Sequence, residues 1–314
     1  WIKDYGPSLS NHVLSDSVRG VSAGFLQSNS TAAEYNTYTN MITSFNTDGF
    51  SLGADTPGWV NYPGRGPYVG WSWKAGGNSN TFNKNGTGYA SASAAGLTAG
   101  TITPTGSSVN TETGFSIIKY QGASTASTVP HGLGTTPELI FIKSLNNTGN
   151  WITYSSVTGT DYYMYLNSDA APADYPSDPP WTNITSTTFG INGTFSDYND
   201  SSTNYIAYCF TSIPGYSQIG YYIGTDVTSG NQIYTGFKPA WLLVRNVSTT
   251  KYWYIVDNKR STTNPRNKEL YPNNTDAEGT MDSVNFLDYG FELATTDSGY
   301  NDAGNQYLFM AFSE

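Results

Sequence analysis

Short runs in which apolar or aromatic residues alternate with polar ones recur along most of the chain. Clusters of Gly, Asn, Asp, Ser and Pro separate these runs, as is typical of strands joined by tight turns. No window shows a convincing helical stripe, and the best helix candidate, Ala90–Ala95, is diluted by Ser. In the middle of the chain the pattern predicts strands at Leu139–Lys143, Trp151–Ser155, Tyr162–Leu166, Thr187–Ile191 and Asn204–Phe210.

The second half of the chain repeats itself at an offset of 102 residues. The segment that starts at Pro137 and ends at Lys143 matches the one from Pro239 to Arg245. Several aromatic anchors recur at the same offset, which indicates one fold written twice. These anchors are Trp151 and Trp253, Phe189 and Phe291, and Tyr205 and Tyr307.

A third copy lies at the front of the chain. Trp1-Ile-Lys3 matches Phe141-Ile-Lys143, and Tyr68–Trp73 matches Tyr205–Phe210. This copy has no counterpart of the strand at Gly114–Tyr120 or of the turn at Pro130–Gly134. We therefore expect the first module to be truncated, with its opening strands lying upstream of Trp1.

These observations predict an all-β fold of tandem, jelly-roll-like β-sandwich modules in three related copies, the first of them incomplete. The expected divisions are a first module at 1–75, a second at 115–215 and a third at 216–314. The Gly-, Ser-, Thr- and Asn-rich segment 76–114 between the first two is expected to be either a flexible linker or a strap packed along a neighbour.

Composition narrows the classes of function. With 14 Lys and Arg against 24 Asp and Glu, the chain has the wrong sign of charge for binding nucleic acid. No apolar run reaches membrane-spanning length, so we expect no membrane insertion. The single cysteine, Cys209, excludes an internal disulfide and reads as a half-buried thiol.

Residues suited to catalysis are sparse. The two histidines, His12 and His131, are expected to be structural, and no catalytic motif, cofactor-binding loop or complete metal-binding pattern is found. The sequence therefore predicts no catalytic residues, no cofactor and no metal. Asp-rich turns near Asp197 and Asp297 leave open a surface calcium, but a turn that binds its own backbone is favoured.

Two kinds of residue stand out as candidates for contacts. Asp16 with Arg19 and Asp257 with Arg260 occupy the same place in copies one and three, and predict structural ion pairs at strand ends. Aromatic residues in polar loops form a second group that suits stacking on sugar rings or a subunit interface, with local loop packing as the third alternative. These residues are Trp59, Tyr62, Tyr175, Trp181 and Tyr300.

The chain resembles a repeat found in virion structural and tail-fibre-like proteins of tailed bacteriophages, notably marine cyanophages. The resemblance rests on Gly114–Tyr120, Val129–Lys143, Asp16–Gly20, Tyr205–Phe210 and Tyr307–Glu314. It implies a non-enzymatic component of the virion surface and supplies no catalytic residues. We accordingly expect a tail fibre or surface appendage that recognises host-surface glycan, forms a homo-oligomer, most simply a trimer, and contacts other virion proteins.

Three alternatives remain open from the sequence alone. The first is a capsid decoration or cement protein whose loops touch only other virion subunits. The second is a polysaccharide depolymerase, which would require two carboxylates with perturbed pKa values in a cleft. The third is a bacterial adhesin or filament subunit.

Overall fold

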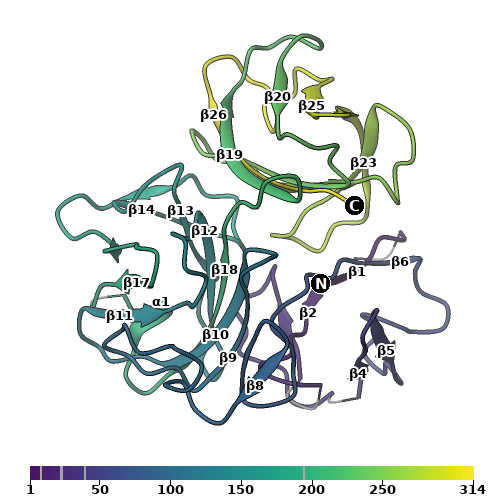
Figure 1. Cartoon of the computed structure of the whole chain (residues 1–314). Coiled ribbons are helices and arrows are strands. Elements are labelled where there is room, and N and C mark those ends of the chain that lie inside the picture. Colours follow the sequence, from purple (N-terminus) through teal and green to yellow (C-terminus); the bar gives the residue numbers. More distant parts are fainter. Residues whose placement is uncertain (8, 22–23, 39, 194) are drawn as a thin grey trace.

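The computed structural model describes residues 1–7, 9–21, 24–38, 40–193 and 195–314. Three groups of strands lie around a common centre, one for each copy of the repeat (Figure 1). We call them module 1 (residues 1–75), module 2 (76–215, with its N-terminal strap) and module 3 (216–314). The prediction of an all-β chain built from sandwich-like modules is confirmed. In the described ranges the lone α-helix is the single turn α1 (Ser196–Asn199).

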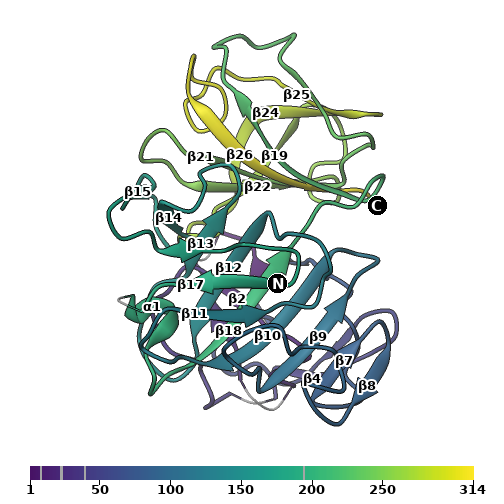
Figure 2. The same ribbon diagram turned by 60° about the vertical axis from the view of Figure 1, so that its left-hand side comes forward.

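Module 2 is built on a nine-stranded sheet in the order β15-β14-β13-β12-β18-β10-β9-β7-β8. A smaller sheet in the order β11-β17-β16 covers its outer face, and α1 lies beside it (Figure 2). The central strands are β10 (Phe115–Gln121), β12 (Leu139–Ser144), β13 (Ile152–Ser155), β14 (Tyr162–Tyr165) and β18 (Asn204–Phe210). The others are β7 (Phe82–Lys84), β8 (Thr87–Tyr89), β9 (Gly106–Asn110), β11 (Ser127–Pro130), β15 (Ala173–Asp174), β16 (Trp181–Thr182) and β17 (Thr188–Ile191).

Module 3 forms one eight-stranded sheet in the order β19-β26-β21-β22-β23-β24-β25-β20. The sheet curves so that its two ends meet. Phe291 of β25 makes an edge-to-face contact with Phe309 of β26, with ring centroids 5.3 Å apart. The strands are β19 (Ser217–Ile223), β20 (Gln232–Tyr234), β21 (Trp241–Asn246), β22 (Trp253–Asp257), β23 (Arg266–Leu270), β24 (Gly279–Leu287), β25 (Gly290–Leu293) and β26 (Gln306–Phe312).

Module 1 is smaller. Its main sheet has the order β3-β2-β1-β6, and a separate hairpin β4-β5 lies against one face. The bounds are β1 (Ile2–Asp4), β2 (His12–Leu14), β3 (Leu26–Gln27), β4 (Ile42–Phe45), β5 (Phe50–Leu52) and β6 (Tyr68–Gly70).

The same three-strand arrangement underlies all three modules. In each, a base strand lies between a neighbour that follows it in sequence and the last strand of the module: β1 between β2 and β6, β12 between β13 and β18, β21 between β22 and β26. The register also repeats. Lys3 pairs with His12, as Arg245 pairs with Trp253. The three modules thus present equivalent residues at equivalent places.

The segment 76–114 extends the sheet of module 2. Its strand β9 pairs antiparallel with β10, and β7 pairs parallel with β9 (Figure 2). Leu97 and Ile102 are buried in the outer core of the same module. The best helix candidate of the sequence, Ala90–Ala95, forms turns instead.

The inner faces of the three modules share one core. Twenty-one buried residues from all three modules form it, among them Trp151, Trp253 and Tyr208. At its centre lie three equivalent aromatic residues that touch one another: Trp73, which follows β6, Phe210 of β18 and Phe312 of β26. Their ring centroids are 6.4 Å (Trp73 to Phe210), 5.8 Å (Trp73 to Phe312) and 6.4 Å (Phe210 to Phe312) apart. This nearly equilateral triangle marks a pseudo-threefold axis within a single chain.

Candidate functional site

A buried cation joins each module to the next. Lys3, Lys143 and Arg245 hold equivalent positions at the ends of the base strands, and each is 0% exposed. Lys143 Nζ donates to the carbonyl oxygens of Gly149 in its own module, at 2.6 Å, and of Thr31 in module 1, at 2.9 Å. Lys3 Nζ makes the corresponding contacts, to the carbonyls of Ser10 in its own module and Thr275 in module 3. Arg245 Nη2 donates to two carbonyls of module 2, those of Asp169 and Ala170.

The main chain repeats the same joint. The N–H groups of Ser10, Gly149 and Lys251 donate to the carbonyls of Thr275, Thr31 and Asp169 at 3.1, 2.9 and 2.9 Å. Module 1 therefore binds module 3, module 3 binds module 2, and module 2 binds module 1. The three joints close a ring, so that each module is held on two sides.

An asparagine anchors the receiving loop of each joint. Asn29, Asn167 and Asn273 accept hydrogen bonds through Oδ1 from the N–H groups of His12, Trp151 and Trp253, at 2.9, 2.7 and 3.0 Å. The indole N–H groups of Trp151 and Trp253 donate to carbonyl oxygens of the neighbouring modules. The acceptors are Gln27 of module 1, at 2.8 Å, and Tyr165 of module 2, at 3.0 Å. Together these bonds fix the loop whose carbonyls bind the cation.

Burial disfavours the charged form of these cations. It lowers the pKa of Lys3 and of Lys143 from 10.5 to about 8, in part offset by nearby Asp4 and Asp276 for Lys3 and by Asp197 for Lys143. It lowers the pKa of Arg245 from 12.5 to about 10, offset in part by Asp169. The carbonyl oxygens of the joint supply hydrogen-bond partners for the buried Lys3 and Lys143 ammonium groups and for Arg245 Nη2.

The predicted ion pairs are formed, and they are more buried than ion pairs at the surface. We call each Asp–Arg pair a brace. Arg19 Nε lies 2.5 Å from Asp16 Oδ2, and Arg260 Nε lies 2.7 Å from Asp257 Oδ2, with all four side chains at most 4% exposed. Each arginine holds a second carboxylate, Glu34 in module 1 at 2.6 Å and Glu278 in module 3 at 3.0 Å.

Each brace also touches the neighbouring module. The Tyr208 hydroxyl of module 2 donates to Asp16 Oδ2 at 2.7 Å, and Arg260 lies over the ring of Trp71 in module 1, 5.7 Å from its centroid. Burial acts to raise the pKa of Asp16, but the charge of Arg19 and the hydrogen bonds outweigh it and the pKa is lowered. In module 2 the equivalent positions are Ser155 and Thr158, which carry no charge.

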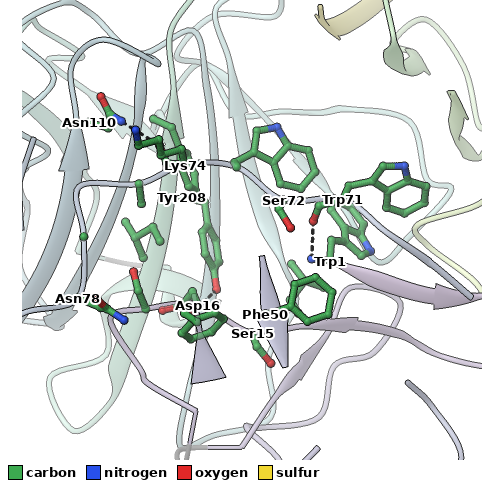
Figure 3. Close-up of a pocket in the computed structure, with 18 of the residues that line it drawn as sticks. Trp1, Ser15, Asp16, Phe50, Trp71, Ser72, Lys74, Asn78, Asn110 and Tyr208 are labelled. Carbon is green, nitrogen blue, oxygen red and sulfur yellow. Dashed lines mark hydrogen bonds between the residues drawn. The ribbon is translucent and has the colours of Figure 1, made fainter. Parts of the chain in front are cut away.

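A cavity of about 860 Å³ lies between module 1 and module 2 (Figure 3). Aromatic residues of module 1, among them Phe50 and Trp71, line one part of it, while Tyr208 and the Asp16 brace line another. Lys74, Asn78 and Asn110 lie on its polar side.

The five candidate loop aromatics differ in how much of each side chain is exposed to solvent. Tyr62 and Tyr175 are each 44% exposed. Trp181 and Tyr300 are 1% and 0% exposed, so their expected role as exposed contact residues is wrong. Trp181 packs against Tyr154 and Tyr198, and the Tyr300 hydroxyl donates to Glu269 Oε2 at 2.9 Å. Trp59 is half-buried among Phe25, Tyr35 and Tyr38.

Tyr300 is a repeated core residue that the sequence comparison missed. Its equivalent 102 residues earlier is Tyr198, and each accepts a hydrogen bond through its backbone carbonyl, from Tyr222 and Tyr120 respectively, at 2.8 Å. The loop setting hid this recurrence. Trp181 has no aromatic counterpart, since in the strand register Val284 stands at its place in module 3.

The histidines and the cysteine are held inside the modules. Burial lowers the pKa of His131 from 6.5 to about 4, and its ring contacts the Thr185 carbonyl at 3.1 Å and the Leu133 N–H at 3.3 Å. Burial also lowers the pKa of His12 well below its usual range. It raises the pKa of the Cys209 thiol to about 12, which keeps the sulfur protonated and unreactive at neutral pH.

The acidic turns bind their own surroundings. Asp197 accepts from the Asn150 N–H at 3.1 Å and from the Tyr165 hydroxyl at 3.0 Å, while Asp297 accepts from the Gly299 N–H at 2.7 Å. Among the described residues no group of three or more His, Cys, Asp or Glu side chains is placed to hold a metal ion. Over the same residues, no helix has the length and apolarity needed to cross a bilayer.

The joint residues are what sequence reasoning missed. Asn29, Asn167 and Asn273 are spaced by 138 and 106 residues, whereas the base strands are spaced by 140 and 102, so the loops do not align at one offset. The signal was present as Asn-Ser-Thr31, Asn-Ser-Asp169 and Asn-Asn-Thr275, but such short polar strings are common in this composition.

Comparison with known proteins places the chain in a family. A family model described as a domain of unknown function, DUF7483, matches residues 1–314. The chain belongs to the DUF7483 family. Among curated protein sequences, no match to this DUF7483 chain is found. A solved structure, the major capsid protein P2 from Bacteriophage PM2, matches 64% of this chain and 98% of its own at 10% identity, with a TM-score of 0.22. A likeness this slight supports no argument about fold or function.

Proposed function

We propose that the protein is a non-enzymatic structural component of a bacteriophage virion, displayed as a tail fibre or other surface appendage. The observation that supports this best is where the buried charge lies. Lys3, Lys143 and Arg245 each bind carbonyls of a neighbouring module. The chemistry of the fold is thus directed to holding three modules together.

The resemblance to virion and tail-fibre repeats supports the same proposal. The polysaccharide depolymerase is the weaker alternative, because the buried acid of the cavity, Asp16, is neutralised by Arg19. Glu269, whose pKa burial raises, accepts hydrogen bonds from the Tyr271 and Tyr300 hydroxyls inside module 3. Asp48 and Glu112 also line the cavity, but both are exposed side chains, whereas glycoside hydrolysis requires a positioned pair of carboxylates.

Imaging of the particle tests the proposal. Cryo-electron microscopy of virions labelled with an antibody fragment against this chain should place it on the tail or another projection. A regular position on the capsid lattice would favour the cement protein, and absence from particles would contradict a virion role. Release of reducing ends from host envelope by the purified chain would contradict the non-enzymatic part.

Host-surface glycan is the ligand that we propose for this appendage. Tyr62 and Tyr175 support it, since both rings remain exposed and can stack on the apolar face of a sugar. Glycan-array binding by the wild-type chain that is lost in Tyr62→Ala or Tyr175→Ala supports recognition by these loops. Equal binding by all three proteins would overturn it.

The oligomeric state needs its own measurement. One chain already places three modules around an axis, which is the arrangement that three copies of a simpler fibre subunit would give. We propose that the trimer of the sequence-based hypothesis is built on top of this ring. Light scattering should give a mass near three times 34.0 kDa. A mass of 34.0 kDa at micromolar concentration would show that a single chain suffices.

A further inference from the structure

Module 1 has an unpaired edge where the other modules have a strand. In module 2, β10 pairs with β18 along seven residues, and in module 3, β19 pairs with β26 along seven residues. In module 1, β6 is the equivalent of β18 and β26. Within the described ranges β6 pairs only with β1, so its second edge offers free N–H and C=O groups.

A second unpaired edge lies on the outer layer of the same module. The outer strands β17 and β25 are flanked by β11 and β20 in modules 2 and 3. Their equivalent in module 1 is β5, which pairs only with β4 among the residues described. Both free edges therefore correspond to one structural unit, the pair of strands that opens modules 2 and 3.

Side chains along these edges are exposed where their equivalents are buried. Phe189 and Phe291 are 0% exposed, whereas the equivalent Phe50 is half-buried. Leu52 of β5 is 39% exposed, although its equivalent Ile191 is 0% exposed. An apolar sheet edge of this kind is a ready template for another strand.

The cavity lies beside β5 and the segment that follows β6, since Phe50 and residues 71–75 line it (Figure 3). In module 2, Phe115 of β10 pairs with the equivalent of Trp73, and Val129 of β11 pairs with the equivalent of Phe50. Trp73 and Phe50 both line the cavity of module 1, together with Trp1 at the start of the base strand. The cavity is thus at the place where the opening strands of module 2 begin and end.

We propose that this groove binds an extended pair of β-strands, with the alternating apolar pattern of residues 115–130, that completes module 1 by adding to β6 and β5. The groove offers two rows of backbone hydrogen-bonding groups and an apolar surface between them. Both features favour a polypeptide over a small molecule. No described segment of the chain is spare for this role, because β10 with β11 and β19 with β20 are paired in their own modules.

The polypeptide immediately preceding Trp1 in a longer chain is the occupant to which the geometry points. In modules 2 and 3 the opening strand begins 24 residues before the base strand, Phe115 before Leu139 and Ser217 before Trp241. Covalent linkage makes the effective concentration of such a strand high, of the order of millimolar for short linkers. This inference concerns the completeness of module 1 and is independent of where on a particle the protein lies.

A graft tests it with the chain as it is. A copy of residues 114–140 placed directly before Trp1 supplies the opening strands with the spacing found in module 2. We expect amide hydrogen exchange of residues 68–73 to slow by at least about tenfold, the melting temperature to rise, and tryptophan fluorescence to shift to the blue as Trp71 and Trp73 lose water. The matched control is the same graft with its copies of Phe115 and Ile117 replaced by serine, which keeps length and backbone but removes the two apolar inner residues.

Each outcome decides the matter. A slower exchange in the graft and not in the serine control supports the proposal. Equal exchange in the graft, the control and the ungrafted chain overturns it. Protection of residues 68–73 in the ungrafted chain that increases with protein concentration would identify a second copy as the occupant and would also overturn it.

Discussion

Modules 2 and 3 have the same strand order around the base strand, the same register and the same kind of joint. They differ in how the strand after the base strand ends. Module 3 closes β22 with the buried Asp257–Arg260 pair, and Arg260 holds Glu278 as well. Module 2 closes β13 with Ser155 and Thr158, whose hydroxyls bond only to nearby backbone. The same scaffold thus tolerates a charged brace and a neutral turn.

The neighbouring module accounts for part of this difference. The braces face Tyr208 in one case and Trp71 in the other, groups that offer a hydroxyl or an aromatic face to a charge. The equivalent residue in β26 is Met310, which offers neither. Buried charges need partners to offset the loss of water, so the brace occurs where the opposing strand supplies one.

Removing one half of a brace gives an effect as large as any that we predict. Asp257→Ala leaves Arg260 buried without its closest carboxylate, and such a loss costs about 3–5 kcal/mol of unfolding free energy. Urea unfolding followed by tryptophan fluorescence measures it. The double substitution Asp257→Ser with Arg260→Thr copies module 2 and should cost less than Asp257→Ala alone. A double variant as unstable as the single one would show that the charge itself is required.

Acid pH distinguishes module 2 from module 3, because in the strand register Thr235 stands at the place of His131. His131 has a pKa of about 4 in the folded state against 6.5 when unfolded, so the unfolded chain binds its proton first. The stability that neutral His131 contributes is present above pH 6.5 and is lost as the pH falls to about 4, up to about 3 kcal/mol in total.

The variant His131→Gln keeps hydrogen-bonding capacity without titrating in this range. We expect its unfolding free energy to fall less between pH 6.5 and 4 than that of the wild type. The remaining fall includes the contributions of His12 and of the Trp1 amino group, because burial lowers both of their pKa values as well. An identical pH profile for both proteins would contradict the assignment to His131.

The joints can be compared by exchanging their cations. Lys143→Met removes the donor that binds Thr31 and Gly149, leaves two buried carbonyls without it, and should cost about 1–3 kcal/mol. Arg245→Lys places the cation of module 2 in module 3 and should cost less, because an ammonium donor still reaches the same carbonyls. Denaturant midpoints rank the two, and the reverse order would argue against carbonyl binding as the role of the cation.

Much of this fold was accessible from the sequence because repetition amplifies weak signals. The spacing of Pro137 and Pro239 and of Trp151 and Trp253 revealed the second and third modules, and the alternation of β18 and β26 identified their strands. The braces were also predicted, since Asp-x-x-Arg recurs at one place. The burial of individual side chains could not be predicted from the sequence, because it depends on which modules pack against each other.

The limits are clearest at three residues. Trp181 and Tyr300 stand in polar stretches of sequence, which indicates exposure, but Trp181 belongs to the outer strand β16 and both side chains are buried. Asn167 and its equivalents define the joints, yet differences in loop length displace them from the 102-residue offset. The ring itself is a long-range property, which no local pattern encodes.

The smallest stability effect is expected at the exposed rings, and here the contrast with the buried ones is sharpest. Tyr62→Ala and Tyr175→Ala should change the unfolding free energy by less than about 0.5 kcal/mol, since both rings are largely in water. Trp181→Ala, by contrast, removes a buried ring and should cost about 3–5 kcal/mol. Host-cell adsorption of particles that carry these variants then has a clean interpretation for the tyrosines only. Reduced adsorption with unchanged unfolding would assign them to contact, whereas a loss of stability would place them with the core aromatics.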